Sequence, residues 1–289
     1  MKGIVLAAGT GSRLGPSTLA TTKHLLPVYD KPMIYYPLSI LMLAGIRDVL
    51  LVCTSRDLAA MRRLLGDGSA FGIAIDYATQ DHPGGIAEAF VVGRAFVADE
   101  PCALILGDNL FHGGGLRLAL RRATTLESGC HLFGYRVAHA ESFGVIEFDT
   151  DGETPRRIIE KPARPPSQFA VTGLYFYDGE ACERCRSLRP SPRGELEITD
   201  VNNGYLADGK ARVEQLGRGI AWLDAGTPDS LMSAGHFVQT IQERQGQFVA
   251  CLEEIALDNG WIDREAVAAT AERLRASPYG RYLGTLTDG

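Results

Sequence analysis

The sequence predicts an α/β fold: a Rossmann-like, mainly parallel sheet flanked by helices, with a small β subregion and a helical C-terminal extension. Over residues 1–128, short apolar runs typical of buried strands alternate with helical patterns, as expected for βαβ units. From residue 129 strand-like runs follow one another without long helices between them, and residues 228–289 are helical in pattern. We therefore expect a single domain, 1–289, in three parts: 1–128, 129–227 and 228–289.

The elements of the first part are set by apolar runs and by the glycines that end them. Residues 4–8 form the first buried strand, and a glycine-rich loop follows it directly. Gly45 and Gly66 follow helical stretches, which is the usual place of a helix C-cap. The predicted strands are residues 4–8, 48–53, 73–78 and 102–106, and the predicted helices are residues 37–44, 57–65, 86–97 and 116–126.

The later elements follow from the same patterns. Several β-rich segments could either extend the sheet or form the small β subregion, and long helical patterns end the chain. The predicted strands are residues 131–137, 143–148, 156–160 and 170–177, and the predicted helices are residues 228–245 and 263–276.

Composition excludes several classes of protein. Of the 289 residues 45% are hydrophobic, and 29 Lys and Arg against 35 Asp and Glu give a formal charge of −6. Such a chain is too apolar to be disordered, and without basic runs it is not expected to bind nucleic acid. It shows no signal peptide and no membrane-spanning run, so we expect a cytoplasmic protein. The scattered cysteines, including the Cys182-x-x-Cys185 pair, are expected to be reduced structural thiols.

The loop after the first strand, residues 9–15, is the first candidate site. Ligands of open α/β sheets lie beyond the carboxyl ends of strands, and glycines let backbone N–H groups approach an anion. Leu14 stands where a dinucleotide-binding fingerprint needs glycine, and the P-loop pattern is also absent. Arg13 and Lys23 instead supply fixed cations, which suit a triphosphate. The alternative is a tight surface turn with solvated cations.

Acidic residues at strand ends form the second candidate site. Asp108 follows the most apolar strand of the chain, and Asp224 has a similar setting. Two carboxylates from separate strand ends could hold one Mg²⁺, which binds a few protein oxygens together with substrate phosphates. The alternative is that each caps the following helix or turn. Lys161, after Glu160, could anchor a second anionic group or could simply form a surface pair with that glutamate.

Many ordered motifs resemble the sugar-1-phosphate nucleotidylyltransferase family, above all its thymidylyltransferases, over nearly the whole chain. The matching stretches are Leu6-Ala-Ala-Gly-Thr-Gly-Ser-Arg-Leu14, Lys23-His-Leu-Leu-Pro-Val-Tyr-Asp-Lys-Pro-Met33, Gly107-Asp-Asn-Leu110, Glu160-Lys-Pro162, Val171-Thr-Gly-Leu-Tyr-Phe-Tyr-Asp178, Ser191-Pro-Arg-Gly-Glu-Leu-Glu-Ile-Thr-Asp200 and Trp222-Leu-Asp224. The resemblance implies Mg²⁺-dependent transfer of a nucleotidyl group from dTTP to α-D-glucose 1-phosphate, which yields dTDP-glucose and pyrophosphate. It also implies a homotetramer with no nucleic-acid or membrane partner.

The resemblance implies roles for individual residues. Residues 1–128 would form the nucleotide-binding half and residues 129–227 the sugar-phosphate-binding half. The nucleotide would be held by Leu6, Ala8, Gly9, Gly11, Arg13, Lys23, His24, Gln80, Gly85 and Asp108. The sugar phosphate would be held by Asn109, Gly144, Glu160, Lys161, Val171 and Arg193. The catalytic set would be Arg13, Lys23, Lys161 and Asp108, with Asp108 and Asp224 as the Mg²⁺ ligands.

The sequence departs from the family pattern at positions that bear on substrate and regulation. His24 stands where the thymidylyltransferases mostly have glutamine, so use of UTP or another NTP, or of another sugar 1-phosphate, remains an alternative. Asp258 replaces an arginine in the family's regulatory stretch, and an acid there is expected to repel a diphosphate. A non-catalytic sugar-nucleotide-binding regulator is a more remote alternative, because it would be expected to lose a phosphate cation or a metal ligand.

Overall fold

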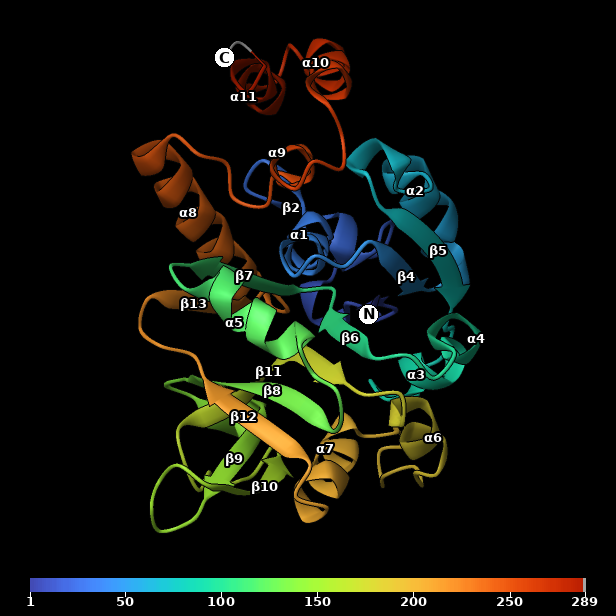
Figure 1. Ribbon diagram of the computed structural model, residues 1–289, viewed down its shortest axis with the longest axis vertical. Coiled ribbons are helices and arrows are strands. Elements are labelled where there is room, and N and C mark those ends of the chain that lie inside the picture. The colour runs from blue at the N-terminus through green and yellow to red at the C-terminus, as the bar shows by residue number, and fades with distance from the viewer. Residues whose placement is uncertain (288–289) are drawn as a thin grey trace.

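A nine-stranded mixed sheet runs through the molecule in the order β10-β9-β11-β6-β1-β4-β5, with β8 beside β11 and β12 beside β8 (Figure 1). The computed structural model describes residues 1–287, and it confirms the predicted α/β class. The strands of this sheet are β1 (Lys2–Ala7), β4 (Asp48–Cys53), β5 (Ala74–Thr79), β6 (Cys102–Leu106), β8 (Cys130–Arg136), β9 (Gly144–Phe148), β10 (Pro155–Glu160), β11 (Phe169–Tyr177) and β12 (Ala211–Gln215).

The first part of the chain forms the parallel side of the sheet. β1 lies between β4 and β6 and is parallel to both, and β5 continues the parallel arrangement beyond β4. Leu6 is in register with Leu106, so the carboxyl ends of β1 and β6 lie side by side. The loops that follow these strands therefore emerge at the same edge of the sheet, where ligands of α/β folds bind.

The β-rich segments after residue 129 extend this sheet instead of standing apart from it. β11 is antiparallel to β6, and it also pairs with β8 and β9. Because β11 is long and pairs with strands on both of its sides, it joins the two parts of the chain in one continuous sheet. The predicted β subregion is thus the mostly antiparallel side of a shared sheet.

Two short ribbons complete the β structure. β7 (Asn109–Gly113) pairs antiparallel with β13 (Ile220–Asp224), with Asp224 opposite Asn109. β2 (Pro27–Val28) pairs with β3 (Lys31–Pro32). In the first ribbon β13 pairs with β7, which follows β6 directly, and this pairing brings Asp224 close to Asp108.

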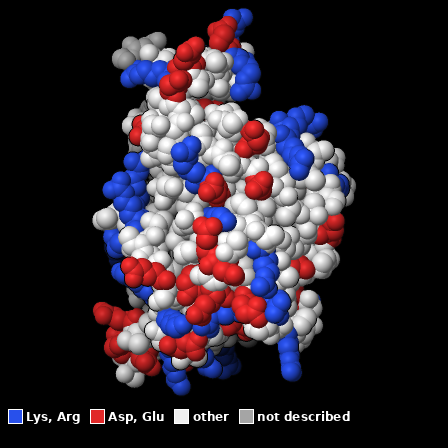
Figure 2. Space-filling model, turned by 45° about the vertical axis from the view of Figure 1, so that its right-hand side comes forward, with Lys and Arg blue, Asp and Glu red and all other residues white. Residues whose placement is uncertain are grey.

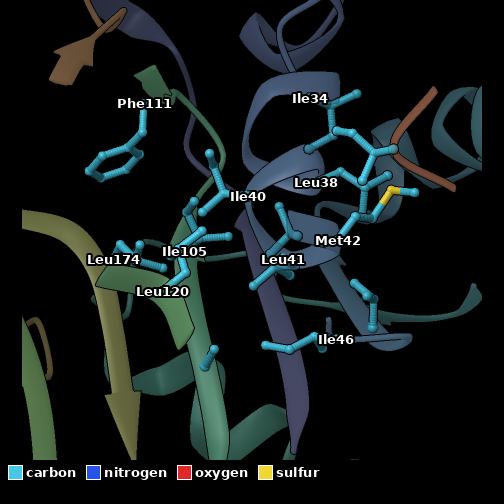
Figure 3. Packing of buried hydrophobic residues seen from close by; sticks show 14 of the residues in the cluster. Ile34, Leu38, Ile40, Leu41, Met42, Ile46, Ile105, Phe111, Leu120 and Leu174 are labelled. Atoms are coloured by element: carbon cyan, nitrogen blue, oxygen red, sulfur yellow. The ribbon is translucent and has the colours of Figure 1, made fainter. Parts of the chain in front are cut away.

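Helices cover both faces of the sheet. Ile40 of α1, Ile105 of β6 and Leu174 of β11 belong to one buried cluster, in which Leu120 of α5 also lies (Figure 3). The helices are α1 (Tyr35–Leu43), α2 (Ser55–Leu65), α3 (Glu88–Val92), α4 (Arg94–Val97), α5 (Leu116–Thr124), α6 (Ala181–Arg186), α7 (Ile198–Ala207), α8 (Pro228–Gln245), α9 (Leu252–Asp258), α10 (Arg264–Arg273) and α11 (Pro278–Thr285). Burial of each large aliphatic side chain stabilises the fold by about 1.5–3 kcal/mol.

One helix prediction is wrong, because the structure has two short helices in place of one long helix. Residues 86–97 do not form a single helix, because α3 ends at Val92 and α4 begins at Arg94. A Cβ atom at Gly93 would lie 2.9 Å from the carbonyl oxygen of Ala89 and 2.9 Å from Leu50 of β4. The glycine therefore lets the chain pack closely on the sheet at the point where the helix breaks.

The C-terminal extension is helical over its described part, from α8 to α11, and residues 288 and 289 lie outside that part. Within residues 1–287 no helix combines the length and apolar character needed to cross a bilayer. Acidic and basic side chains are intermixed over the face shown in Figure 2. All six cysteines are free and buried, and burial raises the pKa of the Cys182 thiol to about 11, which fits the expected structural role.

Candidate active site

The glycine loop forms a cradle of free backbone amides at the end of β1. Gly11 has a left-handed conformation with φ 65°, and a short 3-10 helix, η1 (Ser12–Leu14), follows it. A Cβ atom at Gly11 would lie 3.0 Å from Cγ2 of Thr18 and 3.2 Å from Cβ of Lys23, so the position requires glycine. Within residues 1–287, the backbone N–H groups of residues 9–13 donate to no protein acceptor. Such a run of free amides can bind an anion.

Lys23 lies beneath this loop and forms an ion pair with Asp108. The Lys23 ammonium donates to Oδ2 of Asp108, and a Cβ atom at Gly9 would lie 3.5 Å from Cε of the lysine. Burial alone would raise the pKa of Asp108, but the Lys23 ammonium outweighs burial and the pKa is lowered. Asp108 is therefore held as a carboxylate directly below the amide cradle.

Asp224 faces Asp108 from the neighbouring ribbon. Burial raises the pKa of Asp224, and the negative charge of Asp108 raises it further. Its Oδ1 accepts the N–H of Gly226 at 2.9 Å, and a Cβ atom at Gly226 would lie 2.6 Å from Nη2 of Arg13. Arg13, Asp108 and Asp224, far apart in the sequence, thus meet at one edge of the sheet.

The two carboxylates fit a magnesium ion that is bound together with a phosphate. Burial first, and then the charge of Asp108, raise the pKa of Asp224, and a cation between the two would relieve their repulsion; their hard oxygens suit Mg²⁺. No group of three or more His, Cys, Asp or Glu residues with metal-binding geometry occurs in residues 1–287. Mg²⁺ here would need water and substrate oxygens as its other ligands. Neither aspartate caps a helix, since Thr227 is the N-cap of α8 and the side-chain partners of Asp108 are Lys23 and Asn109, but Asp224 does cap the turn that follows it through the N–H of Gly226.

A cavity of about 560 Å³ opens beside these residues. The predicted site residues that line it come from both residues 1–128 and residues 129–227: Arg13, Asn109, Gly144, Glu160, Lys161, Val171 and Asp224. The other predicted residues, from Leu6 to Gly11 and including Lys23, His24, Gln80, Gly85, Asp108 and Arg193, do not line it. Most of the expected sugar-phosphate residues therefore share one chamber, and among the expected nucleotide residues Arg13 is the one that lines it.

Glu160 and Lys161 lie at the end of β10 with their charged groups in the chamber. Lys161 has an unusual left-handed conformation with φ 44°, and its N–H donates to the carbonyl of Phe143 at 3.0 Å. Its ammonium is 3.7 Å from Oε1 of Glu160 and its side chain is 51% exposed, so it is free to bind an incoming anion. Arg193 approaches Glu160 at 3.7 Å but is held more closely by Glu197, at 2.8 Å.

Asn109 supports its neighbours at the floor of the chamber. Its Oδ1 accepts from the indole N–H of Trp222 at 2.6 Å and from the N–H of Gly173 at 3.1 Å. Its Nδ2 donates to Oδ1 of Asp108 at 3.0 Å. The side chain predicted to bind the sugar phosphate is thus largely engaged in orienting Asp108 and Trp222.

Gln80 and Gly85, which the resemblance assigns to the base, lie together. Gln80 is 5% exposed and its Nε2 donates to the carbonyl of Gly85 at 3.3 Å. Its Oε1 is buried and has no hydrogen-bond partner within residues 1–287. Gly85 has φ 95°, and a Cβ atom there would lie 2.4 Å from the carbonyl oxygen of Leu196. The Gln80 oxygen is thus a buried acceptor whose hydrogen-bonding capacity the described residues leave unused.

His24 is placed differently from the other predicted nucleotide residues. Its side chain is only 1% exposed, and Nδ1 shares a 2.9 Å hydrogen bond with Oγ1 of Thr22. The ring packs under Gly107, where a Cβ atom would lie 2.5 Å from Cδ2 of the histidine. Burial, and then the Lys23 charge, lower the pKa of His24 to about 3. His24 is therefore a neutral packing group below the site.

Several chamber residues were missed by the sequence analysis, among them Tyr175, Thr199 and Trp222. A signal for one of them was present: Val171, Gly173 and Tyr175 alternate along β11 and so share the face that lines the chamber. Thr199 lies at the start of α7, and its hydroxyl donates to Oε2 of Glu160 at 2.7 Å. No local pattern marks that contact, because it depends on how α7 packs against β10.

The stretch to which the resemblance assigns regulation does not line this chamber. Asp258 and Glu254 line a second, smaller cavity of about 200 Å³, together with Arg117 and His112. The acid that replaces the family's arginine thus faces a cavity with a second carboxylate in its wall.

Comparison with known proteins agrees with the geometry. The family described as nucleotidyl transferase matches residues 2–241. A glucose-1-phosphate thymidylyltransferase of Xanthomonas campestris pv. campestris (strain B100) is 55% identical over 99% of this chain and 96% of that relative. One of Neisseria gonorrhoeae is 53% identical over 98% of each chain.

Solved structures show the same similarity. A Bacillus anthracis structure described as a glucose-1-phosphate thymidylyltransferase in complex with sucrose has a TM-score of 0.76 at 40% identity, and covers 82% of this chain and 94% of that one. A UDP-glucose pyrophosphorylase bound to UDP-glucose shares the fold at 23% identity, with a TM-score of 0.73 and coverage of 83% and 98%. The chain therefore belongs to the nucleotidyl transferase family, with glucose-1-phosphate thymidylyltransferases as relatives over nearly its whole length.

Proposed function

We propose that this nucleotidyltransferase transfers the thymidylyl group of dTTP to α-D-glucose 1-phosphate and releases dTDP-glucose and pyrophosphate. One observation carries the proposal: an amide cradle, two carboxylates and a chamber lined by cations lie together at one edge of the sheet. Relatives that are 55% and 53% identical bear the name of this activity. The phosphate cations and both acidic residues are retained, which argues against a non-catalytic regulator.

The reaction needs positioned charge more than it needs a base. The sugar phosphate is already an anion, so its oxygen can attack the α-phosphorus in line while pyrophosphate leaves on the opposite side. The obstacle is repulsion between two anions. Arg13, Lys23 and the free amides would hold the triphosphate, and Lys161 with Arg193 would hold the sugar phosphate. Holding both reactants in line can supply up to about 7–11 kcal/mol.

Asp108 and Asp224 are the residues that would hold Mg²⁺. When bound, the ion would shield the phosphate charge of the nucleotide. The Lys23 ammonium already neutralises Asp108, and the Asn109 amide orients it. These contacts keep the carboxylate fixed below the amide cradle before any ligand arrives.

The base would be read at Gln80. Its unpaired Oε1 would accept the ring N3–H of thymine once the side chain turns this buried oxygen toward the ligand. Uracil carries the same N3–H, so this contact selects pyrimidines of that type and leaves UTP as the second candidate substrate. His24 was predicted to widen nucleotide use. Any such effect would be indirect, through the position of Gly107, because the His24 ring packs on that residue.

A matrix of sugar 1-phosphates against dTTP, UTP and the other NTPs, read by pyrophosphate release with and without Mg²⁺, tests the proposal. We expect the highest kcat/KM for dTTP with glucose 1-phosphate, and no turnover without the metal ion. A wild-type protein that releases no pyrophosphate in any combination would refute it. For the UTP alternative, a His24→Gln variant should lower the ratio of UTP to dTTP turnover, and an unchanged ratio would remove His24 from nucleotide choice.

Three further expectations remain part of this proposal. Residues 1–128 supply the nucleotide-binding half and residues 129–227 the sugar-phosphate half. The protein assembles as a homotetramer, which light scattering of the purified chain would test. The reaction takes place in the cytoplasm, and fractionation of the producing cells would test that location.

A further inference from the structure

A short segment crosses the glycine loop on the side of Lys23. This strap, residues 16–22, follows η1 and carries two buried side chains, Thr18 at 6% exposed and Thr22 at 1% exposed. The next residue, Leu19, is 79% exposed. Thr18 Oγ1 donates to the carbonyl oxygen of Gly11 at 2.9 Å. The strap is thus attached to the loop through one threonine.

The Gly11 carbonyl is held at both of its acceptor positions. It accepts the N–H of Leu14 at 2.9 Å in addition to the Thr18 hydroxyl. In a trans peptide the carbonyl of one residue and the N–H of the next point in opposite directions. A Gly11 carbonyl turned toward the strap therefore keeps the N–H of Ser12 turned away from it.

We propose that Thr18 is a positioning residue for the phosphates of the nucleotide. Its hydroxyl fixes the peptide between Gly11 and Ser12, so that the cradle presents N–H groups, and no carbonyl oxygen, to the phosphate charge. Without that hydroxyl the Gly11 peptide is held by one hydrogen bond fewer and can rotate its oxygen toward the anion. This inference rests on the proposed nucleotidyl transfer.

Packing and hydrogen bonding at Thr18 can be separated by mutation. The Cγ2 methyl group of Thr18 lies 3.0 Å from the Cβ position of Gly11, and Cβ of Lys23 lies 3.2 Å from the same position. Thr18→Val keeps this methyl contact and removes only the donor. Thr18→Ser keeps the donor and removes the methyl group. Thr21→Val is the matched control, because Thr21 lies on the same strap and its hydroxyl makes no hydrogen bond within residues 1–287.

Steady-state kinetics of the full chain with dTTP and glucose 1-phosphate test the role. We expect Thr18→Val to raise the nucleotide KM about three- to tenfold, the effect of one neutral hydrogen bond, and to leave the sugar-phosphate KM within about twofold. Thr18→Ser and Thr21→Val should keep both KM values within about twofold of wild type. Calorimetry with pyrophosphate alone should show the same loss for Thr18→Val, because the cradle binds phosphate groups.

The outcomes separate this inference from the proposed function. A wild-type protein that turns over dTTP with glucose 1-phosphate, while Thr18→Val matches Thr18→Ser in nucleotide KM and pyrophosphate affinity, would refute the role of Thr18 alone. Equal increases in both KM values would also refute it, because they would show general damage to the site. A wild-type protein without turnover would refute the proposed function and this inference with it.

Discussion

Replacing the buried histidine below the site should change how acid affects the stability of the protein. His24 is 1% exposed and its pKa is lowered to about 3 from an ordinary value of 6.5, first by burial and then by the Lys23 charge. The unfolded chain therefore takes up a proton at His24 as pH falls through 6.5, while the folded protein does not. Because the unfolded state binds more protons, the free energy of unfolding must decrease as pH falls.

The size of this effect follows from the two pKa values. Each pH unit between them lowers the free energy of unfolding by about 1.36 kcal/mol. Between about pH 7.5 and about pH 5.5, His24 should account for a loss of about 1.4 kcal/mol, because the proton uptake begins only near 6.5. A His24→Gln variant has no such group and should lose that much less than wild type over the same interval.

Urea unfolding of both proteins at the two pH values measures the difference. Other titrating groups are common to the two proteins and cancel in the comparison. His236→Gln is the control, because it makes the same chemical change at an exposed position on α8. Equal losses in wild type and His24→Gln would show that the ring is not held neutral in the folded protein.

Three other substitutions test the site directly. Lys161→Ala should raise the sugar-phosphate KM about tenfold and the nucleotide KM much less; equal effects in steady-state kinetics would contradict its assigned role. Gly226→Ala would place a Cβ atom 2.6 Å from Nη2 of Arg13 and 2.9 Å from Oδ1 of Asp224, so kcat/KM should fall about tenfold or more. Gly217→Ala is the control and should leave kcat/KM unchanged, because no atom lies within 4 Å of the added Cβ. Asp224→Asn should raise the Mg²⁺ concentration for half-maximal turnover about tenfold or more in a metal titration, and an unchanged requirement would exclude it as a ligand.

The parts of the fold that depend on local sequence were predictable. β4 and β6 have the predicted bounds because each is an uninterrupted apolar run closed by polar or glycine residues. The pairing of β7 with β13 is different, since it joins segments from distant parts of the chain and no local pattern specifies it. The break at Gly93 also depends on a tertiary contact, the approach of that residue to Leu50.

The same division applies to the site. Arg13 and Lys23 could be singled out because they are cations beside a glycine loop, and Asp108 and Asp224 because a carboxylate at the end of a buried strand needs a partner. The burial of His24 could not be read from the sequence, because a histidine after a lysine has no preferred environment until the neighbouring loop at Gly107 closes over it. Charged ligands are thus easier to infer than the neutral groups that support them.

Because β7 pairs with β13, the ligand site exists only when the early and the late parts of the chain are folded together. Arg13 comes from the first turn after β1 and Asp224 from the end of β13, so neither a released N-terminal fragment nor a C-terminal one retains the joint site. A ligand that touches both binds the native state only, and at a concentration of 100 times its Kd it raises the free energy of unfolding by about 2.7 kcal/mol. Protection from proteolysis by dTTP should therefore extend to cleavage sites in both halves of the molecule.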